Sequence, residues 1–214
     1  MLYICSVERY KTQIMKNTIK NTKKGILMVT MFATLLSFAN DASLFNIKND
    51  AERTALTLYN VKQGNLLSVK DINGVILFKE YIQESGTYTK GFDLTALPNG
   101  AYIFELDKDL EINTIPFTVK SNIVLFEKEN EKTIFKPMVR VEGDKVYVSK
   151  LALNEEPLEI KIYFEGLNGS ELMFTETIEN TKIIERIYRL DGLNTGSYKI
   201  VFYTEGREFI KTIN

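Results

Sequence analysis

With 44% hydrophobic and 26% charged residues, the 214-residue chain has the composition of a folded protein rather than a disordered one. It contains no histidine and one cysteine, Cys5, which excludes Ser-His-Asp and Cys-His nucleophilic sites and imidazole metal ligands. Six of the 27 basic and one of the 28 acidic side chains lie in the first 39 residues, leaving 21 against 27 and a net charge of −6. Without a basic patch, this remainder lacks the electrostatic footprint of a nucleic-acid-binding protein.

The first 39 residues have the pattern of a secretory signal peptide. After Met15, lysines precede an apolar run over 25–38, and small residues at Ser37 and Ala39 suit a signal peptidase. We therefore expect cleavage before Asn40. An uncleaved anchor and a buried helix are the alternatives, although the run is shorter than the ~20 residues that a transmembrane helix needs. Residues 1–14 have no clear pattern, and Met15 is the expected true start.

Cleavage there would leave a chain of 175 residues without cysteine, because Cys5 lies upstream. This excludes thiolate catalysis, zinc–sulfur sites and disulfides in the exported protein, whose stability must come from its apolar core. The length suits one large or two small domains.

Short stretches of alternating apolar and polar residues, with no helical period, fill the rest of the chain. In its first half they predict strands over 54–59, 66–72, 75–82, 88–94, 101–106 and 112–119. Turns at Gly64-Asn65, Asn73-Gly74 and Ser85-Gly86 separate the earlier strands. Many short strands at close spacing are typical of an antiparallel β-sandwich.

The second half repeats this plan after a charged link over 127–132. Strands are expected over 134–141, 146–148, 158–164, 172–178, 183–190, 198–203 and 208–213, the first of them at a sheet edge because it contains Pro137. The predicted fold class is all-β: two tandem antiparallel immunoglobulin-like β-sandwich domains, over 45–126 and 133–214, after an N-terminal signal peptide over 1–39.

One nine-residue motif occurs twice, 96 residues apart, as Leu94-x-x-Leu97-x-x-Gly100-x-Tyr102 and Leu190-x-x-Leu193-x-x-Gly196-x-Tyr198. An Asn-Gly turn precedes each copy, at Asn73-Gly74 and Asn168-Gly169. We interpret the motif as a structural corner, in which the glycine permits a turn with positive φ and the tyrosine hydroxyl bonds nearby backbone. Two unrelated hairpins are the alternative, but two matching copies favour an internal repeat.

The motif resembles the tyrosine corner of immunoglobulin-like sandwiches. With the Asn-Gly hairpin and a terminal strand that bears Lys211, it also resembles the C-terminal sorting domain of type IX secretion substrates in Bacteroidetes, and equally the small secreted immunoglobulin-like proteins of those bacteria. The resemblance implies that a sorting domain takes its protein through the outer membrane and is then removed.

Two features depart from the sorting-domain pattern. Sorting domains usually open with an Asn-Pro turn, whereas Gly64-Asn65 and Glu156-Pro157 stand near that place here. The first repeat is also internal, so it cannot be a C-terminal signal. We therefore expect two structural modules, with a genuine sorting signal in the second repeat as the alternative.

Carboxylates are the remaining candidates for chemistry. Asp93 and Glu105 flank the first corner and could imitate the carboxylate pair of a glycosidase. The aligned positions in the second copy are Arg189 and Val201, so the pair is not a feature of the repeat. We therefore expect Asp93 and Glu105 to be solvated residues on the face of a sheet. Asp107 and Asp109 at a loop tip are too few for a convincing calcium site.

Outward-facing tyrosines are the candidates for binding. Tyr163 and Tyr203 are placed to form a sugar-binding platform, with ordinary cross-strand pairing as the alternative.

The function expected from the sequence is that of a secreted or periplasmic, non-enzymatic structural or interaction protein, with no catalytic residue, metal or cofactor. The alternatives are a type IX secretion substrate whose C-terminal repeat is a sorting domain, and a glycan-binding module. The expected partner is an unidentified protein or cell-surface polymer, not a nucleic acid. The expected location is the periplasm, the outer-membrane surface or the extracellular space, and after signal cleavage the protein is not expected to be an integral membrane protein.

Overall fold

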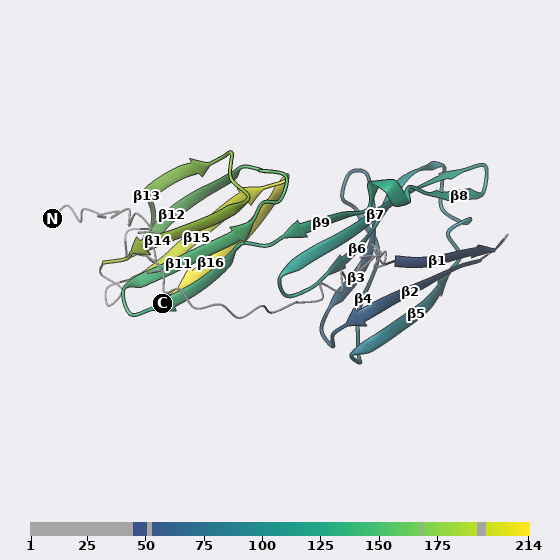
Figure 1. Cartoon of the computed structure of the whole chain (residues 1–214), viewed down its shortest axis with the longest axis horizontal. Coiled ribbons are helices and arrows are strands. Elements are labelled where there is room, and N and C mark those ends of the chain that lie inside the picture. Colours follow the sequence, from purple (N-terminus) through teal and green to yellow (C-terminus); the bar gives the residue numbers. More distant parts are fainter. Residues whose placement is uncertain (1–44, 51–52, 168, 192–195) are drawn as a thin grey trace, which may run out of the picture. The chain divides into compact units, whose positions relative to one another are not determined.

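The computed structural model describes residues 45–50, 53–167, 169–191 and 196–214, in which strands alternate with turns and one 3-10 turn occurs at Lys128–Asn130. The expected signal peptide, Cys5, Asn168 and Leu193 lie outside these residues. The strands form two antiparallel β-sandwiches (Figure 1), which confirms the predicted fold class. Nowhere in the described ranges is a helix long and apolar enough to cross a membrane.

The first sandwich pairs a three-stranded sheet, β1-β2-β5, with a six-stranded sheet in which β4-β3-β6-β7-β8 are neighbours and β9 also pairs with β7. Its strands are β1 (Phe45–Asp50), β2 (Arg53–Val61), β3 (Leu66–Asp71), β4 (Ile76–Tyr81), β5 (Gly86–Phe92), β6 (Gly100–Asp107), β7 (Glu111–Lys120), β8 (Ile123–Phe126) and β9 (Lys132–Phe135). Asn73-Gly74 turns β3 into β4, as expected from this dipeptide, with Gly74 at φ +82°.

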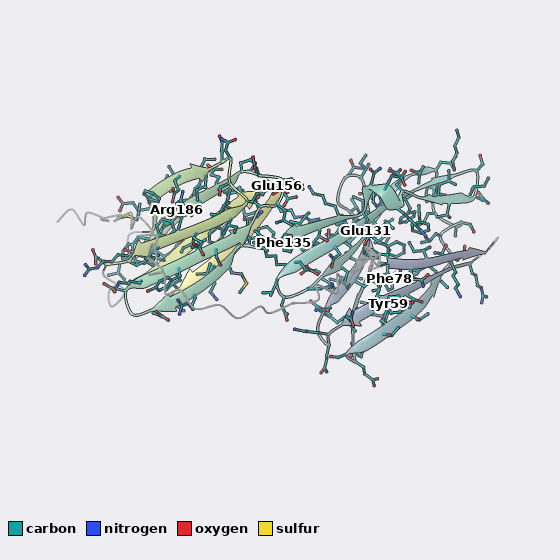
Figure 2. All side chains as sticks on the ribbon, viewed as in Figure 1. Tyr59, Phe78, Glu131, Phe135, Glu156 and Arg186 are labelled. Carbon is teal, nitrogen blue, oxygen red and sulfur yellow. The ribbon has the colours of Figure 1, made fainter. Side chains whose placement is uncertain are left out.

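Alternation along each strand builds the core of this sandwich. On β2, Leu56 and Leu58 are fully buried, because every second side chain points between the sheets. Aromatic rings join the two sheets: Phe92 lies 5.2 Å from Phe78 and 5.1 Å from Phe104, both in edge-to-face geometry that rings favour. Phe78 on β4 and Tyr59 on β2 are labelled in Figure 2.

The second sandwich pairs the three-stranded sheet β10-β11-β14 with the four-stranded sheet β13-β12-β15-β16. Its strands are β10 (Met138–Glu142), β11 (Lys145–Leu151), β12 (Leu158–Gly166), β13 (Gly169–Ile178), β14 (Ile183–Arg189), β15 (Ser197–Thr204) and β16 (Arg207–Ile213). Leu158, Ile160 and Ile162 on β12 are fully buried, as the clean alternation of this segment predicts.

The strand expected over 134–141 is divided into two. The N–H of Lys136 still bonds the carbonyl of Leu110 at 2.9 Å, but the next residue, Pro137, has no N–H to donate, so the pairing ends there. Before the break, β9 pairs with β7, with Ile134 opposite Ile112. After the break, β10 pairs with β11. The first strand that pairs within the second sandwich therefore begins at Met138.

The two tyrosines of the repeated motif lie in similar surroundings. Tyr102 is 6% exposed and donates a 2.8 Å hydrogen bond to the carbonyl of Pro98. Tyr198 is 3% exposed and donates a 2.6 Å hydrogen bond to the carbonyl of Asp191. Each hydrogen bond thus joins the strand that carries the tyrosine to the segment that precedes this strand. The leading leucines, Leu94 and Leu190, are buried, and Leu97 packs against the first core.

The two motif glycines lie in different surroundings. Gly100 has no positive φ, so the turn with positive φ that its glycine was expected to permit is not found there. Gly196 is required for space: a Cβ there would lie 2.5 Å from the ring of Phe164 and 2.7 Å from the carbonyl oxygen of Glu165. The atom nearest to a Cβ on Gly100 would be the hydroxyl oxygen of Tyr102, at an ordinary 3.5 Å.

Substitution by alanine separates the two glycines. We expect Gly196→Ala to lower the free energy of unfolding by about 1–3 kcal/mol, the usual cost of overpacking, because the Glu165 carbonyl belongs to the backbone and cannot rotate away. Gly100→Ala is the matched control and should leave stability unchanged or slightly raised, because alanine lowers the entropy of the unfolded chain. Urea denaturation followed by circular dichroism measures both, and equal losses in the two variants would contradict this steric explanation.

Candidate binding face

Glu105, expected to be solvated, is instead a buried carboxylate in a salt bridge. It lies on β6 between the core residues Phe104 and Leu106, on the opposite face of the strand, and its side chain is 7% exposed. It accepts hydrogen bonds from Lys70 at 2.7 Å and Arg207 at 2.5 Å. Burial alone would raise the pKa of the Glu105 carboxyl, but these bonds outweigh burial and hold the pKa below 4.5. Glu105 therefore stays ionised, unlike a general acid.

The other acidic candidates also contact neighbouring side chains. Asp93 accepts a 2.7 Å hydrogen bond from the hydroxyl of Thr95. Asp107 accepts one from Lys136, and Asp109 lies 3.8 Å from Lys62. In the part of the chain that the structure describes, no group of three or more acidic, cysteine or histidine side chains could hold a metal ion. These carboxylates serve as partners of lysines and hydroxyls.

Tyr163 and Tyr203, in contrast, lie on one sheet face, directed away from the core. Ile160 and Ile162 of β12 point inward, so Tyr163 points outward by strand alternation. On the adjacent strand β15, Phe202 points inward and Tyr203 outward by the same rule. Both tyrosines are half-buried and take part in contacts with charged neighbours.

Tyr163, Lys199 and Glu165 form one interacting triad. Lys199 is the cross-strand partner of Tyr163, and its ammonium lies 5.1 Å from the centre of the tyrosine ring. The same ammonium lies 3.1 Å from the carboxylate of Glu165, which also accepts a 2.8 Å hydrogen bond from Ser170. The bonds from Ser170 and Lys199 hold the pKa of the Glu165 carboxyl below its usual value. The triad therefore carries one positive and one negative charge.

Tyr203, Lys161 and Glu159 form a second triad of the same composition. The ammonium of Lys161 lies 5.0 Å from the ring centre of Tyr203 and 2.9 Å from the carboxylate of Glu159. The hydrogen bond to Glu159 raises the pKa of Lys161, and a hydrogen bond with Glu208 raises the pKa of the Tyr203 hydroxyl. Lysine and tyrosine are both protonated at neutral pH, so this triad also has one charge of each sign.

We call these six residues the tyrosine–lysine face. Its middle is occupied by Val201, which is only 4% exposed although it lies on the outer side of β15. The surface beside Tyr203 is hollowed, with Pro157, Thr177 and Glu208 among the lining residues. The face is thus a partly exposed surface on paired strands, with two aromatic rings and two lysine–glutamate pairs. On the adjacent strand β16, Glu208 lies opposite Tyr203 and the exposed Ile210 lies opposite Val201.

Strand alternation alone placed both tyrosines outward. The lysines over the rings were not foreseen, because the sequence does not reveal which residue of β15 lies opposite Tyr163. Cross-strand register depends on the packing of the whole sandwich. The burial of Glu105 was missed for a similar reason, since Arg207 lies 102 residues further along the chain.

No protein-family model and no curated protein matches this chain. Among solved structures, it resembles the BSP domain of a biofilm-associated protein, with 12% identity and a TM-score of 0.26 over 79% of this chain and 28% of that one. The chain thus spans little more than a quarter of that structure. A two-domain fibronectin type-III segment of chicken tenascin has 11% identity and a TM-score of 0.26 over 79% of this chain and 97% of that one. The FN1-FN3 domains of chicken CNTN1 have 10% identity and a TM-score of 0.24 over 79% and 63%. Similarities this low say nothing about what the chain binds or does.

The salt bridges of Glu105 give the protein a specific pH dependence. A folded-state pKa below that of the unfolded chain contributes stability above about pH 4.5, and this contribution is lost as the pH falls through the folded-state pKa. Glu105→Gln should lower the free energy of unfolding at pH 7 by about 1.5–3 kcal/mol, the value of hydrogen bonds to a charged group. The difference from wild type should shrink on acidification, as measured by urea denaturation across pH 3–7, roughly the range that spans the carboxyl pKa.

The control is Glu142→Gln, which removes the carboxylate of the exposed Arg140–Glu142 pair. Exposed pairs contribute little, so this variant should follow the wild-type profile at every pH. A pH-independent deficit in Glu105→Gln would mean that packing, not charge, explains the importance of this residue.

Proposed function

We propose that this protein is an exported, non-enzymatic interaction protein whose second β-sandwich presents the tyrosine–lysine face to a macromolecular partner. The observation that supports this most strongly is the face itself, because half-buried tyrosines directed outward from neighbouring strands are typical of binding surfaces. The acidic candidates for catalysis, in contrast, are engaged in ion pairs or hydrogen bonds.

Export is supported by the signal-peptide pattern before Asn40. Many exported proteins are stabilised by disulfides, which form outside the cytoplasm. This chain has no cysteine after Cys5, so it has no such cross-link there. Its two apolar clusters supply that stability, since each fully buried large aliphatic side chain contributes about 1.5–3 kcal/mol. We place the protein in the periplasm, on the outer-membrane surface or in the extracellular space.

A C-terminal sorting signal is the second candidate role, supported by the resemblance of the last repeat to type IX sorting domains. Against it, β16 is an integral part of the second sandwich: it pairs with β15 over seven residues, from Thr204–Arg207 to Tyr198–Ile213. Phe209 packs on the core and Ile213 is 5% exposed. We therefore propose that β16 is structural, so that its loss opens the core as well as a sheet edge.

Interaction through the face is testable on cells that lack the protein. Purified wild-type protein should associate with the cell surface, and the Tyr163→Ala/Tyr203→Ala variant should lose at least about tenfold in affinity because both rings are removed. The control is Tyr147→Ala, which removes an outward tyrosine of β11 under Arg140, on the other sheet of the same sandwich. Equal cell association of all three proteins, measured by sedimentation and immunoblotting, would contradict an interaction at this face.

Removal of residues 209–214 separates the structural role of β16 from a sorting role. As a structural strand, its loss should cause degradation in the periplasm, just as the core variant Ile162→Ala should, with an expected cost of about 2–5 kcal/mol. Cell fractionation and intact-mass measurement follow both variants, with exported wild-type protein expected to begin at Asn40. Intact truncated protein in the periplasm, together with Ile162→Ala at the cell surface, would favour the sorting signal.

A further inference from the structure

One region of the six-stranded sheet is buried although it is directed away from the core of the first sandwich. Glu105 alternates with core residues of β6, so it points to the outer side, as do its cross-strand partners Ser68 on β3 and Thr114 on β7. Ile112, two residues before Thr114, shares this side with its own partner, Ile134 on β9. Ser68, Glu105, Ile112 and Ile134 are all buried, and neither isoleucine belongs to the apolar core of either sandwich.

The turn between β15 and β16 of the second sandwich reaches this buried region. Arg207, the first residue of β16, donates a 2.5 Å hydrogen bond to the carboxylate of Glu105. Glu205, in the turn, has its carboxylate 2.5 Å from the ammonium of Lys132 on β9. Lys132 lies opposite Thr114, which in turn lies opposite Glu105, so both contacts are made in one row of the sheet. The exchange is reciprocal, because each sandwich contributes one carboxylate and one cation.

The carboxylates of these two ion pairs are withdrawn from water. The side chain of Glu105 is 7% exposed and that of Glu205 is 4% exposed. Glu205 also lies 3.7 Å from Lys150 of β11, whose side chain is fully buried. A buried charge that loses its partner is costly, so both carboxylates stay dry only while the turn remains on the sheet. Loss of one crossing partner therefore favours movement of the turn away from the sheet, where water reaches the remaining charge.

The turn is tight, and the link between the sandwiches is short. Glu205 and Gly206 have φ +52° and +70°, the left-handed backbone of a two-residue hairpin turn. Only Lys136 and Pro137 separate β9 from β10, and the Lys136 ammonium bonds the carboxylate of Asp107 and, at 2.6 Å, the carbonyl of Lys108. A short link keeps the second sandwich near the first, which lowers the entropy lost when the turn meets the sheet.

From these reciprocal, buried ion pairs we propose that the β15–β16 turn is a latch, which holds the two sandwiches in one orientation and opens when either crossing pair is broken. Domains of one chain move relative to each other unless a large apolar interface joins them, and here the crossing bonds are ionic. The latch directly follows Tyr203, and Glu205 and Arg207 line the same hollow as that tyrosine. It thus borders the tyrosine–lysine face, but its closure does not depend on whether that face binds a partner.

Electron resonance distance measurement between two spin labels tests the latch in the exported protein. No cysteine follows Cys5, so Thr87→Cys on β5 and Ser149→Cys on β11, both at exposed positions, place one nitroxide on each sandwich. The protein with these labels alone should give one narrow distribution of distances. Arg207→Glu and Lys132→Glu each oppose a carboxylate to a carboxylate, and each should widen the distribution at least about twofold, because the sandwiches then move independently.

The control is Lys70→Gln, which removes the bond of Glu105 within the first sandwich but leaves the crossing bond from Arg207. It should keep the narrow distribution. Circular dichroism verifies that each variant is folded, and because Arg207 and Lys132 lie on different sandwiches, local damage to one sandwich does not explain the same widening in both reversals. The latch is overturned if the distribution is already wide without a reversal, if either reversal leaves it narrow, or if Lys70→Gln widens it as much.

Discussion

The burial of alternate strand side chains between two sheets is the interaction on which everything else in this protein depends. No cysteine follows Cys5, so the described sandwiches are held by apolar packing and by the backbone hydrogen bonds of their strands. Leu56 and Leu58 in the first sandwich, and Ile160 and Ile162 in the second, are fully buried because the period of two directs them inward. Polar side chains at intervening positions are thereby fixed on the outer faces, where contacts with partners are possible.

Ion pairs join charged side chains that come from distant parts of the chain. Glu105 bonds Lys70 and Arg207, and Lys150, whose side chain is fully buried, lies 3.7 Å from Glu205. Buried charges need such partners because a charge without one is costly to remove from water. The carboxylates that could suggest catalysis in the sequence each have a cationic or hydroxyl partner, and the proposed interaction rests on the tyrosine–lysine face.

The sequence was sufficient for the fold class and for features that depend on local patterns. Alternation in 158–164 gave β12 and its inward residues, and Asn73-Gly74 gave the hairpin of β3 and β4. The sequence was not sufficient where the environment of one residue depends on a residue far away in the chain. The burial of Glu105, and the need for Gly196 beside Phe164, follow from contacts that only the folded chain creates. Pro137 marked a sheet edge, but not the change of sheet that divides the strand around it.

Core packing also determines which residues make up the tyrosine–lysine face. A slip of one residue between β12 and β15 would turn Ile162 outward and Tyr163 inward, so the packing that stabilises the sandwich also fixes the register of the face. Its side chains stand on paired strands rather than on loops, so little conformational freedom remains to be lost on binding.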